Sequence, residues 1–160
     1  MGSDHRVELV GLAPRLPFDG GMTLDDEVVA RDEAGVRVQP TVLVVDDDEA
    51  WRAALKDSLE HEGFHVVAVA RAEWTMPAIE LYRPTVVVID NVMPGPMLGL
   101  DLLPALRLRW PVLPIVMMTA FGGRGTAEEA LRQGATVYFD KPFRVADLVG
   151  EIRRLTDDAG

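Results

Sequence analysis

The hydrophobic pattern from residue 41 onward predicts strands that alternate with helices. Short runs of apolar, mostly β-branched residues occur at 42–45, 64–69, 85–90, 115–118 and 137–139. Runs without polar alternation are typical of strands that are buried on both faces of a parallel sheet. Segments that read as helices follow the runs, over 48–59, 75–82, 100–108, 126–133 and 145–155. Five such units predict an α/β fold, a doubly wound five-stranded parallel sheet with helices on both faces.

Polar, glycine and proline residues mark the ends of these predicted helices. Asp48 is a candidate N-cap for the first helix, which Gly63 ends, and Gly134 ends the helix over 126–133. Pro77 fits only in the first turn of its helix, where its missing N–H costs no hydrogen bond. Pro104 lies within its predicted segment, so we expect it to kink that helix or delay its start.

Two strand-like runs end in carboxylates. The run 42–45 leads directly into Asp46 and Asp47, and the run 86–89 leads directly into Asp90. Because the carboxyl ends of parallel strands meet at one edge of a sheet, the three side chains are expected to converge there. Three converging carboxylates repel one another unless a cation lies among them, and hard oxygen ligands suit Mg²⁺. The sequence therefore predicts an acidic Mg²⁺ pocket.

A hydroxyl and an ammonium group are predicted at the same edge. Thr119 ends the fourth predicted strand and Lys141 follows the fifth. Either residue alone is a weak signal, since both types are common at strand ends. Together with the acidic pocket they supply what a transferring phosphoryl group needs, because metal, hydroxyl and ammonium could each meet one of its oxygens. Carboxylates can act as nucleophiles toward phosphoryl groups.

Composition narrows the class of protein. The chain has 160 residues, 48% of them hydrophobic and 26% charged, which favours one domain with an ordinary core. It contains no cysteine, no apolar run of membrane-spanning length and no signal-peptide pattern, so a cytoplasmic protein is expected. The net charge of −10 argues against direct binding to nucleic acid, which requires a basic patch.

Four short motifs resemble the signature of two-component response-regulator receiver domains of the chemotaxis type, which have a flavodoxin-like fold. They are Val44-Val45-Asp46-Asp47, Ile89-Asp90 followed by Met93-Pro94, Met118-Thr119-Ala120, and Asp140-Lys141-Pro142-Phe143. The resemblance extends from residue 41 to about 155 and places the motifs in the family's order. It implies the strand order 2-1-3-4-5, with a ligand site at the carboxyl edge of the sheet.

The resemblance also implies roles for individual residues. Asp90 would be the phospho-acceptor and would receive its phosphoryl group from a histidine kinase or a phosphotransfer protein. Asp46 and Asp47 would hold Mg²⁺ together with Asp90 and the backbone carbonyl of Val92. Thr119 would contact the phosphoryl oxygens.

Two further roles lie in the last strand and the residues after it. Lys141 would also contact the phosphoryl oxygens, and the bond before Pro142 would be cis, which an X-Pro bond can adopt. Tyr138 matches the family's switch aromatic, whose movement follows that of Thr119. An ordinary strand aromatic is the alternative interpretation of Tyr138.

The chain also departs from the family pattern. A glycine expected after the acceptor comes one residue late, as Gly99, so we expect the loop 94–99 to be remodelled. Val92 and Phe121 are apolar at positions that flank the phosphate in relatives. The stretch 119–123 resembles receivers of the nitrogen-regulation type. No ATPase or DNA-binding module follows in this sequence, so a stand-alone receiver is expected.

Two classes of function remain open at this stage. The first is a phosphorylation-driven switch that is read out by protein binding and is not an enzyme beyond its own phosphorylation and dephosphorylation. The alternative is a Mg²⁺-dependent aspartate-nucleophile phosphatase, although Val92 stands where such an enzyme has a second aspartate. A degenerate receiver is disfavoured by the full set of site residues. The output partner is not identified, a homodimer is an open alternative, and neither nucleic acid nor membrane is expected.

Residues 1–40 form an N-terminal extension to the receiver domain expected over 41–157. The extension is rich in proline and glycine, and the valine-containing segments 28–31 and 36–38 flank a turn-like stretch. They predict a hairpin, whereas a loosely attached tail is the alternative. Because the extension contains many apolar residues, we expect part of it to pack on a receiver surface of the same chain or of a second copy.

Overall fold

The computed structural model describes residues 39–93 and 95–158, and each predicted strand and helix is present there. The strands are β1 (Thr41–Val45), β2 (His65–Val69), β3 (Val86–Asp90), β4 (Ile115–Thr119) and β5 (Val137–Asp140). The helices are α1 (Glu49–His61), α2 (Thr75–Tyr82), α3 (Gly99–Arg109), α4 (Arg124–Gln133) and α5 (Val145–Asp157), and a short 3₁₀ turn, η1 (Ala72–Trp74), precedes α2. The hairpin predicted in the extension lies outside the described residues.

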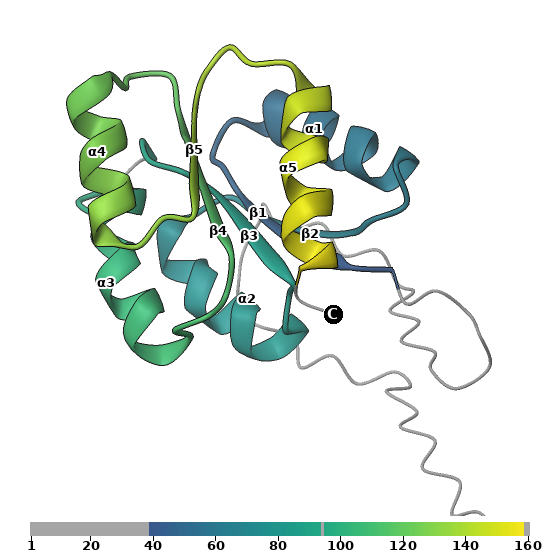
Figure 1. Ribbon diagram of the computed structural model, residues 1–160, viewed down its shortest axis with the longest axis horizontal. Coiled ribbons are helices and arrows are strands. Elements are labelled where there is room, and N and C mark those ends of the chain that lie inside the picture. The colour runs from purple at the N-terminus through teal and green to yellow at the C-terminus, as the bar shows by residue number, and fades with distance from the viewer. Residues whose placement is uncertain (1–38, 94, 159–160) are drawn as a thin grey trace, which may run out of the picture.

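The five strands form one parallel sheet in the order β2-β1-β3-β4-β5. This confirms the fold class and strand order expected from the sequence. Figure 1 shows the sheet between two helical layers, with α1 and α5 on one face and α2, α3 and α4 on the other. None of the helices in the described part of the chain is long and apolar enough to cross a membrane.

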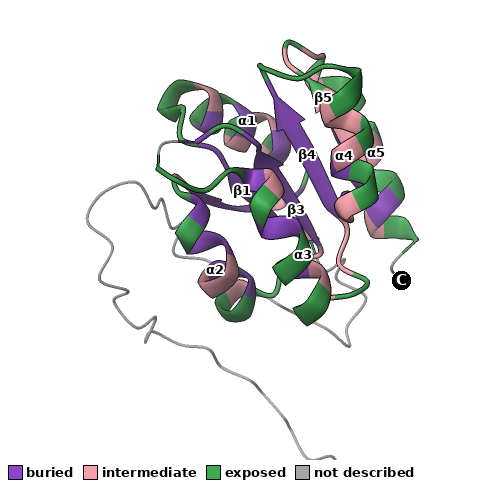
Figure 2. Cartoon of the chain, turned by 90° about the vertical axis from the view of Figure 1, so that its left-hand side faces the viewer, coloured by how far each residue is buried: buried purple, intermediate pink, exposed green. Residues whose placement is uncertain are grey.

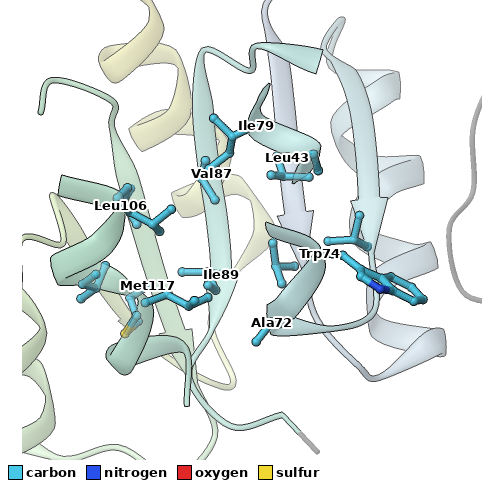
Figure 3. Packing of buried hydrophobic residues seen from close by; sticks show 14 of the residues in the cluster. Leu43, Ala72, Trp74, Ile79, Val87, Ile89, Leu106 and Met117 are labelled. Atoms are coloured by element: carbon cyan, nitrogen blue, oxygen red, sulfur yellow. The ribbon is translucent and has the colours of Figure 1, made fainter. Parts of the chain in front are cut away.

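Alternate residues of the central strands build the two halves of the core. In β1, Leu43 and Val45 pack with α2, α3 and α4, whereas Val42 and Val44 pack with α1 and α5. All four side chains are completely buried, and the central strands are buried along their length in Figure 2. Figure 3 shows the first half of the core, where Leu43 and Leu106 lie among its labelled side chains. Burial on both faces explains the unbroken apolar runs in the sequence.

The predicted helix caps are confirmed. The Asp48 side chain accepts a hydrogen bond of 3.0 Å from the Trp51 N–H, which satisfies one of the donors that an α-helix leaves unpaired at its start. Gly63 and Gly134 follow α1 and α4 with φ angles of +93° and +118°, a conformation that glycine adopts without strain. Pro77 lies in the first turn of α2, as predicted.

Helices α3 and α4 differ in detail from the predicted segments. Helix α3 begins at Gly99 with Pro104 inside it, so of the two expected effects of the proline a delayed start does not occur, and Leu108 is 86% exposed. Leu108 comes two residues after the buried Leu106, which turns it roughly 200° away around the helix. Helix α4 begins at Arg124 and not at 126, because the Ala127 N–H donates to the Gly123 carbonyl across the glycine-rich stretch.

Candidate functional site

The carboxyl edge of the sheet gathers the polar residues that the sequence singled out. Asp46 follows β1, Asp90 is the last residue of β3, and Thr119 is the last residue of β4. Strand pairing places Asp90 beside Met118, one residue before Thr119, and places Thr119 beside Asp140, one residue before Lys141. The parallel register thus carries residues that are far apart in the chain to one end of four adjacent strands, β1, β3, β4 and β5.

Three carboxylates form the centre of this site. Asp46, Asp47 and Asp90 each offer an oxygen, and these three atoms all lie within 4.8 Å of one another. Asp46 is completely buried, Asp90 is 6% exposed, and Asp47 faces solvent. Oxygens on opposite sides of an octahedral Mg²⁺ lie about 4.2 Å apart, so the group fits this cation after small side-chain adjustments. The exposed side of Asp47 leaves room for the water ligands that Mg²⁺ usually keeps.

The electrostatics of Asp90 also favour a cation. The pKa of the Asp90 carboxyl is raised to about 6, chiefly by burial and in addition by the negative charge of Asp46. The Lys141 ammonium and a hydrogen bond from the Val92 N–H, 3.3 Å from Asp90 Oδ1, oppose this shift. The charge of Lys141 therefore offsets only part of the negative charge of the carboxylates.

Lys141 connects the two buried carboxylates. Its Nζ lies 2.7 Å from Asp46 Oδ2 and 3.4 Å from Asp90 Oδ2. The Lys141 backbone N–H donates to the Thr119 carbonyl, which ties the end of β5 to the end of β4. The peptide bond between Lys141 and Pro142 is cis, as the resemblance implied. The ammonium group therefore lies inside the acidic cluster, within reach of a group bound to Asp90.

Thr119 lies at the same edge but faces a different partner. Its side chain is completely buried, and its hydroxyl accepts a hydrogen bond of 3.1 Å from the Phe121 backbone N–H. The ring of Phe121 is 77% exposed, and Val92 is 37% exposed. Both flanking positions therefore present apolar side chains to solvent, beside the carboxylate cluster.

Tyr138 lies close to Thr119, and its hydrogen bond was not evident from the sequence. Its hydroxyl donates to Asp140 Oδ1 at 2.9 Å, and burial together with this carboxylate raises the pKa of the phenol to about 12. A Cβ at Gly122 would overlap the Tyr138 hydroxyl and the Asp140 carboxylate and would press on the Thr119 methyl group. Gly122 therefore fills the narrow space between Thr119 and Tyr138.

Two further residues support the cluster and were missed in the sequence. Arg52, on the first turns of α1, is buried and its Nη1 donates to the Asp46 backbone carbonyl at 2.7 Å. Asn91 is buried after β3, and its side-chain oxygen accepts a hydrogen bond from the Leu100 N–H. An arginine on a helix usually reads as a surface residue, and an asparagine after a strand usually reads as a turn, so neither position carried a signal.

The loop before α3 requires a glycine at position 99, because the backbone lies too close to β3 for a side chain. The Gly99 N–H donates to the Asn91 carbonyl at 2.8 Å, and a Cβ there would collide with the Asp90 backbone carbonyl. The start of α3 is therefore pressed directly against the end of β3. This contact sets the backbone that carries the Asp90 carboxylate.

Comparisons with known proteins agree with this geometry. The family model described as the response regulator receiver domain matches residues 42–153. The chain is 43% identical over 113 residues to response regulator protein FleR of Pseudomonas aeruginosa, an alignment that covers 71% of this chain and 24% of FleR. It is 35% identical over 113 residues to the DNA-binding transcriptional regulator NtrC of Proteus hauseri, with the same coverage of 71% and 24%. The chain thus spans about a quarter of the length of these relatives.

A solved structure supports the same grouping. The receiver domain of the Francisella response regulator 1452 superposes with a TM-score of 0.72 and is 27% identical, covering 76% of this chain and 100% of that domain. Strand order, helix placement and the acidic edge of the sheet are therefore those of receiver domains.

Proposed function

The chain belongs to the response regulator receiver domain family and is a phosphoryl-accepting signalling switch, and we propose that Asp90 is the residue that accepts the phosphoryl group. The observation that carries this proposal is the position of the Asp90 carboxylate, which is nearly buried at the end of β3 and faces the Lys141 ammonium. Of the three clustered carboxylates, Asp46 is completely buried and already paired with Lys141 at 2.7 Å, while Asp47 is exposed.

The phosphatase alternative is not supported. Relatives identified by sequence are response regulators and transcriptional regulators. Val92 stands two residues after Asp90, where the alternative requires a second carboxylate as acid and base. Aspartyl phosphate formed at Asp90 would therefore lack the group that speeds turnover in such phosphatases.

The proposed transfer uses groups that the structure places at the edge of the sheet. A carboxylate oxygen of Asp90 forms a bond to phosphorus while the bond from phosphorus to the donor nitrogen breaks, and the departing imidazole keeps the electron pair and takes up a proton. Lys141 stabilises the charge on the phosphoryl oxygens, and the Thr119 hydroxyl turns from the Phe121 N–H to donate to one of them. Mg²⁺ held by Asp46, Asp47, Asp90 and the Val92 carbonyl would neutralise further negative charge on the phosphoryl group.

The proposed donor is a phosphohistidine on a histidine kinase or a phosphotransfer protein, since receiver domains take their phosphoryl groups from such proteins. The proposed output is binding to another protein. We propose that residues 41–157 are the unit that performs this switch and that residues 1–40 are an extension to it.

Removal of the metal, or of the exposed ligand Asp47, is expected to suppress phosphorylation. With a small acyl phosphate and Mg²⁺ the chain should gain one phosphoryl group, and a chelator should prevent this. Asp47→Asn should weaken Mg²⁺ affinity by about tenfold or more, because Mg²⁺ uses few direct carboxylate ligands and loses one of them. Tryptophan emission during Mg²⁺ titration measures the affinity, since Trp51 lies one helical turn beyond Asp47.

Asp48→Asn is the matched control for that experiment. It removes the same charge from the next residue, and asparagine can still cap α1 in place of Asp48. The control should bind Mg²⁺ nearly as well as the parent chain. Equal loss of affinity in both variants would show that net charge, and not coordination by Asp47, determines metal binding.

The phosphorylated state is expected to be long-lived because apolar side chains flank the site. Hydrolysis needs a water molecule in line with the phosphoryl bond, and neither Val92 nor Phe121 offers a polar group to hold one. Val92→Asn and Phe121→Asn should each shorten the half-life of the phosphoprotein severalfold, as followed on a phosphate-affinity gel. Leu108→Asn changes an exposed leucine at the far end of α3 and should have no effect. Three variants with the same half-life as the parent would contradict the role of the apolar pair.

A phosphoryl group on Asp90 is expected to move Tyr138. When Thr119 turns toward the phosphoryl oxygens, it frees space beside Gly122, and the Tyr138 ring can leave its bond to Asp140. Amide resonances in α4, β5 and α5 should therefore shift when a phosphoryl mimic binds. Gly122→Ala should produce part of the same shift without the mimic, because its methyl group displaces the Tyr138 hydroxyl. Shifts that stay confined to the acidic pocket would refute this switch.

A further inference from the structure

The Lys141 ammonium has a third neighbour besides the two carboxylates. The face of the Trp51 indole lies 5.1 Å from Lys141 Nζ, measured to the ring centroid. Trp51 belongs to the first turn of α1, whereas Lys141 follows β5, so the contact joins two elements that are distant in the sequence. The lysine side chain is only 16% exposed, which weakens competition from water for its charge.

Packing against neighbouring aromatic rings sets the orientation of the Trp51 indole. Its plane is perpendicular to the Phe143 ring at a centroid distance of 5.5 Å, and Phe143 in turn packs on Phe139. The indole Nε1 is buried, and it has no hydrogen-bond partner within the described residues. Aromatic packing on one side and the ammonium on the other therefore fix this ring, and no polar anchor contributes.

We propose that Trp51 is a positioning residue that holds the Lys141 ammonium between Asp46 and Asp90. Lysine has a flexible four-carbon stem and a compact charge, so a single ion pair does not fix its position. The closer carboxylate is Asp46, at 2.7 Å, and Asp90 lies at 3.4 Å. The electron-rich indole face on α1 attracts the ammonium as well. This third attraction keeps the ammonium from moving to one carboxylate and away from the other.

The functional consequence concerns the phosphoryl group, so the inference rests on the proposed role of Asp90. An ammonium that is already held beside Asp90 stabilises charge on the incoming phosphoryl oxygens without first being ordered. The ring contacts of Trp51 described above are with Lys141 and Phe143, so its effect on the phosphoryl group is expected to pass through Lys141. If Trp51 only filled space, another apolar side chain such as leucine could replace it without loss of function.

Nuclear magnetic resonance of the unmodified chain gives the first test. Lys56 and Lys141 are the only lysines, so the ε-methylene signals of the two can be compared directly. Protons above an aromatic face are shifted upfield, so the Lys141 signal should lie upfield of the Lys56 signal. Trp51→Leu should move the Lys141 signal downfield, while Trp51→Phe should keep part of the shift. A Lys141 signal that stays in place in Trp51→Leu would overturn the proposal.

Phosphorylation kinetics give the second test, with a small acyl phosphate and Mg²⁺ as the probe. Trp51→Leu should lower the maximal rate of phosphorylation about tenfold with little change in the Mg²⁺ concentration that gives the half-maximal rate, and Trp51→Phe should recover most of the maximal rate. In a Lys141→Met background, Trp51→Leu should have no further effect, because the partner it positions is gone.

The outcomes separate this inference from the proposed function. Equal rates in Trp51→Leu and the parent, or equal losses in the Leu and Phe variants, would reduce Trp51 to a packing residue while Asp90 remained the acceptor. Additive losses in the double variant would do the same. Loss of phosphorylation at Asp90 itself concerns the proposed function and is tested with Asp90 variants.

Discussion

Replacing Asp90 with asparagine is expected to abolish phosphoryl uptake while leaving the fold intact. Asparagine has nearly the same shape, and its oxygen can still accept the hydrogen bond from the Val92 N–H. Lys141 keeps its closer partner, Asp46, at 2.7 Å. The amide is not a competent nucleophile toward phosphorus, so labelling by an acyl phosphate with Mg²⁺ should fall below detection.

Stability gives this prediction a second readout. The change to a neutral amide removes a nearly buried charge that is repelled by Asp46, so the melting temperature should stay the same or rise. Asp57→Asn, which changes an exposed carboxylate on the outer side of α1, should be labelled like the parent chain. Continued labelling of the Asp90→Asn variant would refute the assignment of the acceptor.

Replacing Arg107 with methionine is expected to cause a large loss of stability. The Arg107 side chain leaves α3 and bonds to backbone carbonyls on the two turns that precede β4 and β5. Its Nε donates to the Gly134 carbonyl at 2.7 Å and its Nη1 to the Leu113 carbonyl at 2.5 Å, and its Nη2 reaches the Thr136 hydroxyl at 3.2 Å. A planar fork of donors suits this arrangement, and no other side chain type supplies one.

Methionine fills the space of the arginine stem but leaves these acceptors without their donor. Hydrogen bonds from a charged group contribute about 1.5–3 kcal/mol each, and partial access of water reduces the sum, so we expect a loss of about 3 kcal/mol. For a domain of this size that lowers the melting temperature on the order of 10 °C. Thermal unfolding followed by circular dichroism measures it, and Arg107→Lys should recover only part of the loss.

Arg109 offers a matched control on the same helix. It is exposed and pairs with Glu80 across the surface, so Arg109→Met should cost less than about 1 kcal/mol. Equal losses from both substitutions would mean that the loss of helix charge, and not the carbonyl network, explains the effect.

The architecture could be predicted because strands that are buried on both faces have a recognisable sequence pattern. Strands such as β3 are buried on both faces and therefore appear in the sequence as unbroken apolar runs. Helices between them are expected because parallel strands need long crossover connections. The acidic edge was predictable for the same reason, since Asp46 and Asp90 interrupt those runs at their ends. Carboxylates at the ends of two such runs therefore sufficed to locate the site.

Features that depend on contacts across the fold could not be predicted. Arg107 and Arg52 look like ordinary surface arginines, because nothing local shows that the backbone carbonyls of other segments surround them. The close approach of Gly122 to Tyr138 follows from how the β4–α4 loop lies on β5. The early start of α4 was missed because Gly125 costs a helix only about 1 kcal/mol, too little to stop it there.

The structure supports some of the predicted site residues more directly than others. The structure brings Asp46, Asp47, Asp90 and Lys141 together, as expected. Thr119 reaches the same edge, but its hydroxyl bonds to the Phe121 N–H in this structure. The roles of Thr119, Val92 and Tyr138 toward a phosphoryl group therefore remain proposals that the variants above test.

Peptide mapping of the phosphorylated chain tests the central claim most directly. After treatment with an acyl phosphate and Mg²⁺, borohydride reduces an aspartyl phosphate to homoserine, which mass spectrometry can place in the sequence. We predict homoserine at position 90 and unchanged aspartate at 46 and 47. Homoserine at either of those two positions, or at any aspartate outside the cluster, would contradict the account of Asp90 as the acceptor.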